Sequence, residues 1–149
     1  MNLATTSPTN TDGAELQCHI YDKTLRNQGA RTTCGKILLH ARSQVAAFRQ
    51  HMGADVCVFK VGVTTNPLER FKGYLAMNFA SMWLVCEHND LGLIHMFEAA
   101  LISEFHQCRG CRNAANSGGE GALNKAVHGG PPYFVYVTGG RADQFKRVG

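Results

Sequence analysis

The feature that most constrains the fold is an uninterrupted run of strand-forming residues, 56–63, that leads directly into a helix start. β-Branched and aromatic side chains dominate this run, which predicts a buried strand at the centre of a sheet. Thr65 or Asn66 can cap free helix amides, and proline, here Pro67, is tolerated in the first turn of a helix. The sequence therefore predicts a strand, a tight connection and a helix over residues 67–74.

The remaining apolar runs predict three more strands and two more helices. Helix 44–51 would be capped by Ser43 and would stop at Gly53, while helix 90–106 is long and amphipathic. Residues 16–21 fit either a short edge strand or the first ordered turn. The further strands are expected at residues 36–40, 81–87 and 133–137.

A chain of 149 residues can bury one ordinary core, so we expect a single α/β domain over residues 15–140. A disordered tail is expected at 1–14 and a short C-terminal tail at 141–149. No run approaches the roughly 18 to 20 apolar residues of a membrane span, and the start lacks a secretory signal. We therefore expect an intracellular protein, cytoplasmic or nuclear, without a membrane partner.

The most specific local pattern follows the strong strand. Residues 59–62 read Phe-Lys-Val-Gly, Thr64 and Asn66 continue the order Gly-x-Thr-x-Asn, and Arg70 lies on the predicted helix. This pattern resembles the second half of the signature of GIY-YIG nucleases, especially viral and mobile-element variants whose strand reads aromatic-Lys-Ile-Gly. The resemblance covers about residues 35–124. It implies an α/β (α+β) fold with a small, central, mainly antiparallel sheet flanked by helices.

The helix after this strand carries the first candidate site residues. A helix that begins at Asn66 places Arg70 and Tyr74 one turn apart on one face, beside the strand end. A planar, permanently charged guanidinium can hold a scissile phosphate through two hydrogen bonds, although an exposed arginine on a solvated helix fits the same pattern. Candidate nucleic-acid contacts in this region are Lys60, Thr64, Asn66, Arg70 and Lys72.

Glu98 is the second candidate, because its carboxylate shares a helix face with the apolar residues between Ile94 and Phe105. An unpaired buried carboxylate is costly, so it is expected to meet a cation. A divalent metal is one such cation, and an ion pair with Arg70 or Lys60 is the other. In the family that the chain resembles, a glutamate on such a helix binds one divalent ion, which implies Mg²⁺ or Mn²⁺ at Glu98.

A third match lies after the long helix, where Asn113 and Asn116 precede Gly-Gly-Glu-Gly at 118–121. Members of the family commonly end their catalytic core with an asparagine near such a loop. The resemblance therefore implies nucleic-acid contacts for Asn113 and Asn116. A plain surface turn accounts equally for the glycines.

The family is thought to use a tyrosine of its first strand to help activate water, and this strand is usually joined to the next by a short hairpin. The nearest matches here are Tyr21, which lies far upstream, and residues 35–38, which carry leucine in place of tyrosine. Lys60 stands where the second tyrosine belongs, and lysine can bind phosphate or act as a base. The proton-transfer residue is accordingly Tyr21, Lys60 or Tyr74.

Six cysteines in a chain without an export signal are expected to be thiols or ligands rather than disulfides. Cys108 and Cys111 form a Cys-x-x-Cys pair two residues after His106, which can supply half of a structural Zn²⁺ site. Reduced thiols are favoured over zinc, because an isolated pair is a weak signal. The other histidines weighed as ligands show no ligand spacing and are expected on the surface: His51, His88, His95 and His128.

A net charge of +4 mildly favours a polyanionic partner. Together with the resemblance, it predicts a metal-dependent endonuclease that hydrolyses phosphodiester bonds, in DNA rather than RNA, with Arg70 and Glu98 facing each other across one shallow groove on the sheet. A homodimer or a partner protein would supply specificity. The alternatives are a catalytically inactive nucleic-acid-binding or protein-interaction module on the same fold, and a small zinc-stabilised interaction domain.

Overall fold

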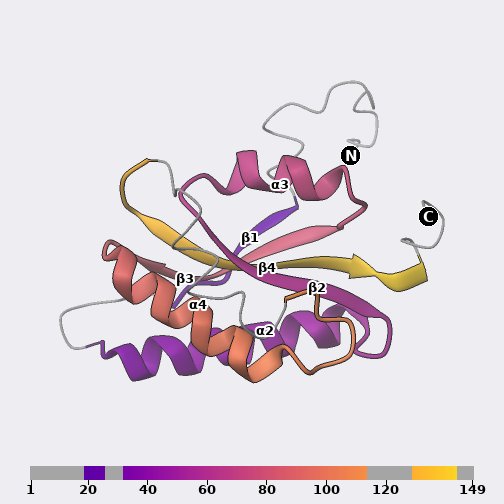
Figure 1. Ribbon diagram of the computed structural model, residues 1–149, viewed down its shortest axis with the longest axis horizontal. Coiled ribbons are helices and arrows are strands. Elements are labelled where there is room, and N and C mark those ends of the chain that lie inside the picture. The colour runs from indigo at the N-terminus through magenta and orange to yellow at the C-terminus, as the bar shows by residue number, and fades with distance from the viewer. Residues whose placement is uncertain (1–18, 26–31, 114–128, 144–149) are drawn as a thin grey trace, which may run out of the picture.

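The computed structural model describes residues 19–25, 32–113 and 129–143 (Figure 1). The predicted N-terminal tail lies outside these ranges, as do residues 144–149 of the predicted C-terminal tail. The elements follow in the order β1 (Ile20–Asp22), α2 (Cys34–Met52), β2 (Cys57–Thr64), α3 (Pro67–Leu75), β3 (Ser81–His88), α4 (Leu91–Phe105) and β4 (Tyr133–Arg141).

The four strands form one mixed, mostly antiparallel sheet in the order β1-β3-β4-β2. The C-terminal strand β4 lies between β3 and β2 and is antiparallel to both, while β1 is parallel to β3. Helices α2 and α4 cover one face and α3 covers the other (Figure 1). The prediction of a mainly antiparallel sheet flanked by helices is confirmed.

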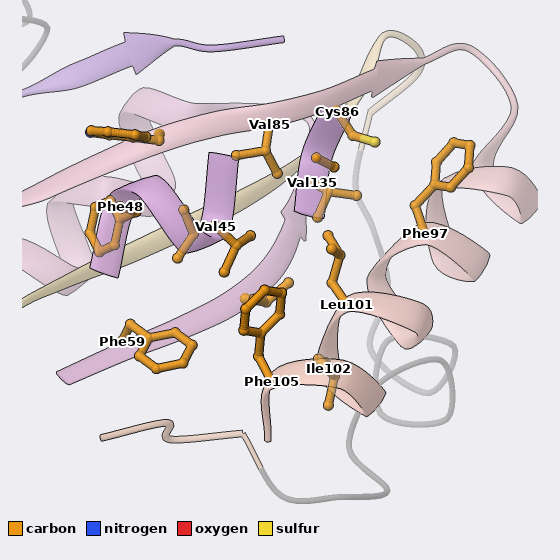
Figure 2. Packing of buried hydrophobic residues seen from close by; sticks show 14 of the residues in the cluster. Val45, Phe48, Phe59, Val85, Cys86, Phe97, Leu101, Ile102, Phe105 and Val135 are labelled. Carbon is orange, nitrogen blue, oxygen red and sulfur yellow. The ribbon is translucent and has the colours of Figure 1, made fainter. Parts of the chain in front are cut away.

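Two apolar cores lie on the two faces of the sheet. The larger core fills the space between the sheet and helices α2 and α4 (Figure 2). Along β4, Val135 and Val137 face this core, whereas Tyr136 faces the smaller core under α3, as the alternation of side chains in a strand requires. The buried residues of the smaller core are Ile20, Phe71, Tyr74, Phe79, Met82, Leu84 and Tyr136.

Strand β2 lies at an edge of the sheet, so the prediction of a central strand was wrong. Its apolar run predicted burial correctly, but a segment outside the named strands covers the free side and pairs with β2 through an isolated parallel bridge between Phe59 and Cys111. The amide of Phe59 donates to the carbonyl of Gly110 at 3.0 Å, and the amide of Arg112 donates to the carbonyl of Phe59 at 2.8 Å. The chain after α4 thus satisfies an edge that would otherwise expose unpaired backbone groups.

Residues 36–40 belong to helix α2 and do not form the predicted strand. The buried residues of α2 are spaced by four, four and three positions, which is the period of a helix. Thr33, and not Ser43, caps the helix, because its side chain accepts a hydrogen bond from the amide of Lys36 at 3.2 Å. Gly53 ends it, as predicted. The buried residues are Ile37, Ala41, Val45 and Phe48.

The other elements agree with their predictions. Helix α3 is capped by Asn66 and helix α4 by Asp90, and β1 is the edge strand that was one of two options for residues 16–21. Local sequence signals therefore placed most elements to within a few residues.

In the described ranges, none of the helices combines the length and the apolar character needed to cross a lipid bilayer.

Strands β4 and β2 approach each other closely at Gly139, so a substitution there tests the packing between them. A Cβ atom at Gly139 would lie 2.1 Å from the carbonyl oxygen of Val58, which belongs to the backbone of β2. We expect Gly139→Ala to lower the free energy of unfolding by about 1–3 kcal/mol, because the strands must separate. Urea unfolding measures this change.

Gly73→Ala is the matched control, because nothing lies within 4 Å of a Cβ atom at this position of α3. It should leave stability unchanged or raise it by roughly 0.5–1 kcal/mol, as alanine does in a helix. Equal destabilisation by the two substitutions would contradict the close packing at Gly139.

Candidate functional site

Tyr136 is the residue around which several candidate residues gather. Its side chain is 1% exposed, and its hydroxyl lies 2.7 Å from the hydroxyl of Tyr74 on α3. Burial raises the pKa of Tyr136 well above its ordinary value, and neighbouring Tyr74 adds to the rise. The charge of Arg70 lowers this pKa and the charge of Glu98 raises it. Both charges therefore act on one buried hydroxyl.

Gly62 makes room for this tyrosine. Residues 62 and 136 are partners in the antiparallel register of β2 and β4. A Cβ atom at Gly62 would lie 2.3 Å from the hydroxyl oxygen of Tyr136 and 2.5 Å from its Cζ, so the phenol crosses directly over the β2 backbone. Because β2 is the edge strand, this hydroxyl lies over the outermost strand of the sheet.

The sequence predicted that Arg70 and Glu98 converge across one shallow groove on the sheet, and this convergence stays a prediction. Helices α3 and α4, which carry them, cover opposite faces (Figure 1). Arg70 is exposed, whereas Glu98 is 6% exposed. What the two residues share is Tyr136, because the charge of each acts on its hydroxyl.

Glu98 is buried, as its place in an apolar helix face predicted. Its Oε1 lies 3.8 Å from Nδ1 of His95, three residues earlier on α4. His95 is 7% exposed, and its Nδ1 has no hydrogen-bond partner among the described residues. Burial lowers the pKa of His95, which favours the neutral imidazole. The prediction of a surface histidine was wrong, although the spacing of three residues to Glu98 was a signal that could have found it.

Tyr21, a candidate for the proton-transfer residue, does not lie beside Tyr136. It lies on β1, and β3 separates β1 from β4. Tyr21 is in register with Trp83, whose side chain belongs to the larger core, so Tyr21 points to the face opposite that of Tyr136. Its side chain is 45% exposed.

Lys60 points to the same face of β2 as Gly62, as predicted from the alternation of strand side chains. Its register partner is Thr138 of β4, two residues after Tyr136, and its side chain is half-buried. Phe59 points to the other face and joins the larger core. Lysine 60 therefore lies on the same side of the sheet as α3.

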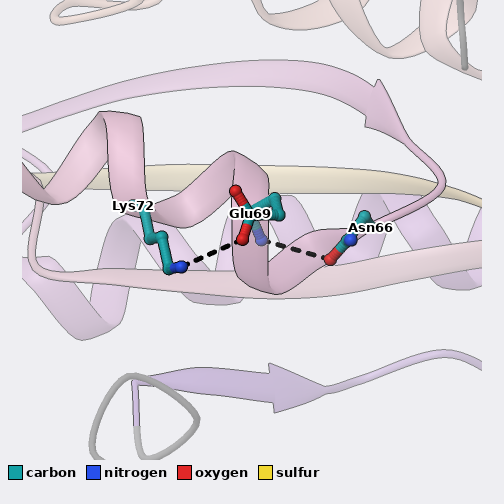
Figure 3. Close-up of polar contacts among 3 residues, drawn as sticks. All are labelled: Asn66, Glu69 and Lys72. Carbon is teal, nitrogen blue, oxygen red and sulfur yellow. Dashed lines mark hydrogen bonds and ion pairs between the residues drawn. The ribbon is translucent and has the colours of Figure 1, made fainter. Parts of the chain in front are cut away.

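The residues around the start of α3 have local roles that hold this helix in place. The Asn66 side chain accepts a hydrogen bond from the amide of Glu69 at 3.2 Å, and Lys72 Nζ lies 2.9 Å from the Glu69 carboxylate (Figure 3). The hydroxyl of Thr64 accepts a hydrogen bond from the amide of Asn66 at 2.9 Å. These contacts fix the first turn and hence the direction of Arg70. Contact of Thr64, Asn66 and Lys72 with nucleic acid stays a prediction.

Asn113 is buried and is engaged by β2. Its Oδ1 accepts a hydrogen bond from the amide of Val61 at 2.8 Å, and its Nδ2 donates to the carbonyl of Val61 at 3.0 Å. The side chain thus takes the place of a neighbouring strand, a structural role in contrast to the predicted contact with nucleic acid. Asn116 and residues 118–121 lie outside the described residues.

Cys108 and Cys111 are half-buried thiols directly after α4. Burial raises the pKa of Cys111, which favours the protonated thiol. In the part of the chain that the structure describes, no three His, Cys, Asp or Glu side chains gather closely enough to hold a metal ion. Structural zinc at this pair stays a prediction, without a third ligand in that part of the chain.

A scan against models of protein families, a search of curated proteins and a search of solved structures each found no match.

The hydrogen bond between Tyr74 and Tyr136 can be tested by a double-mutant cycle. Tyr74→Phe and Tyr136→Phe should each lower the free energy of unfolding by about 1–2 kcal/mol, because each leaves a buried hydroxyl without its partner. The double variant should cost clearly less than the sum, since it removes both hydroxyls together. Urea unfolding of the four proteins gives the coupling, with Tyr133→Phe as a half-buried control, and strict additivity would disprove it.

Proposed function

We propose that this chain is a metal-dependent endonuclease of the GIY-YIG type that hydrolyses phosphodiester bonds in DNA. The observation that carries the proposal is the group formed by Tyr136, Tyr74, Arg70 and Glu98. In this group the charges of an arginine and a glutamate both shift the pKa of one buried hydroxyl. These are the residue types that this chemistry needs: a cation for the phosphate, a carboxylate for a metal and a hydroxyl for water.

In this proposal Tyr136 takes the part that the sequence had assigned to Tyr21, Lys60 or Tyr74. The resemblance calls for a tyrosine on a strand joined by a hairpin to the strand that carries Gly62, and such a strand would be its antiparallel neighbour. Strand β4 is the antiparallel neighbour of β2, although it comes from the other end of the domain. The missing tyrosine is therefore supplied out of sequence order.

The carboxylate of Glu98 fits a divalent ion. It is buried, and carboxylate oxygens are ligands that suit Mg²⁺ and Mn²⁺. Glu98 would hold one Mn²⁺ or Mg²⁺. Such an ion, when bound, polarises a phosphate oxygen and lowers the pKa of bound water.

The protein's own residues would complete the reaction. Arg70, exposed on α3, would hold a non-bridging phosphate oxygen and oppose the negative charge that develops there. Either hydroxyl of the Tyr74–Tyr136 pair can be the donor. A neutral Tyr136 that donates to Tyr74 would keep a lone pair that can accept a hydrogen bond from the attacking water. Lys60 adds positive charge on the α3 side of the sheet, which favours a polyanion.

Cleavage of supercoiled plasmid with Mn²⁺ or Mg²⁺ tests the proposal. We expect nicking by the wild-type protein, and a fall in rate of about 10²-fold or more for Glu98→Gln, Arg70→Ala and Tyr136→Phe. Glu104→Gln is the matched control, because Glu104 lies on the same helix as Glu98 but pairs with Arg42 at the surface. Circular dichroism verifies that each variant is folded.

Equal nicking by wild type and Glu98→Gln would disprove the proposed metal-dependent nuclease. So would the absence of nicking by both proteins with every divalent ion. Salt-sensitive DNA binding without cleavage, weakened by Arg70→Ala, would instead support the inactive binding module.

A further inference from the structure

His95 is a buried titratable residue to which the proposed reaction gives no task. It is more than nine-tenths buried, and its Nδ1 makes no hydrogen bond within the described part of the chain. A buried polar atom left in this state is costly, and native proteins contain few of them. A ligand for this nitrogen would remove the cost.

The nearest charged group to Nδ1 that the structure records is the carboxylate of Glu98. The two residues are three positions apart on α4, so their side chains lie on one face of the helix. The distance of 3.8 Å between Nδ1 and Oε1 is too long for a hydrogen bond. It is shorter than the sum of two ligand bonds of about 2.1 Å, so a single ion can reach both atoms at a wide angle.

We propose that His95 is a second protein ligand of the divalent ion at Glu98, which makes the site a mixed imidazole–carboxylate site. An imidazole ligand favours first-row transition ions, of which Mn²⁺ is the weakest binder, over Mg²⁺, which prefers oxygen ligands and keeps several waters. The site would therefore select Mn²⁺ over Mg²⁺. The inference rests on the proposed function in one respect, which is the use of Glu98 as a metal ligand.

Two protein ligands leave most positions around such an ion open. In the described ranges no third His, Cys, Asp or Glu joins the pair. Water and phosphate oxygens would fill the remaining positions, as they do in sites where an ion acts on a substrate. A purely structural histidine, by contrast, would affect folding and leave metal affinity untouched.

Calorimetric titration with Mn²⁺ and with Mg²⁺ separates these two cases. We expect the wild-type protein to bind Mn²⁺ at least about tenfold more tightly than Mg²⁺, and His95→Gln to lose on the order of tenfold or more in Mn²⁺ affinity with little change for Mg²⁺. Glu98→Gln should lose both ions. His51→Gln, an exposed histidine on α2, is the matched control and should bind like wild type. Mn²⁺ is the probe because the thiols of Cys108 and Cys111 prefer softer ions.

Pulsed electron paramagnetic resonance of the Mn²⁺-loaded wild-type protein gives a second readout that needs no variant. Coupling from a directly bound imidazole nitrogen should be present, and it should vanish in His95→Gln. Mn²⁺ bound without nitrogen coupling, and lost only in Glu98→Gln, would overturn His95 as a ligand and leave the nuclease proposal standing. Absence of Mn²⁺ binding by the wild-type protein would overturn this inference together with the metal of the proposed function, and plasmid cleavage would then decide whether any nuclease remains.

Discussion

The close approach of Tyr136 to Gly62 is the contact on which the rest of the site depends. The phenol crosses the backbone of β2 at a point where a Cβ atom would lie 2.3 Å from its hydroxyl, so glycine is required there. This placement brings the hydroxyl to Tyr74 on α3 and into the field of two opposite charges. The charges of two residues on helices that cover opposite faces of the sheet thus act on one side chain of a central strand.

Much of the scaffold around this contact follows from local sequence. The strand β2, the cap at Asn66 and the burial of Glu98 each arise from signals that lie within a few residues of one another: β-branched residues, a capping side chain before proline, and helical spacing. Local signals also contain their own ambiguity. The apolar run 36–40 fits a strand by composition, and only the period of the buried positions over all of α2 identifies the helix.

The features that could not be predicted are those that depend on strand order. Tyr136 follows Gly62 by 74 residues, and no local preference places β4 between β3 and β2. The same holds for the edge of β2, where Asn113 and its neighbours, far along the chain, take the place of a strand. The tyrosine that the proposal uses therefore comes from the end of the domain, in a run that the sequence identified as a strand and not as a source of site residues.

The arrangement also has a consequence for how the proposed site would respond to its ligands. The charge of Glu98 raises the pKa of Tyr136 and the charge of Arg70 lowers it. Neutralisation of the Glu98 carboxylate by a cation would remove the first effect and make the phenol more acidic. Neutralisation of Arg70 by a phosphate would remove the second effect and make it less acidic. Metal and phosphate would thus act on one hydroxyl in opposite directions.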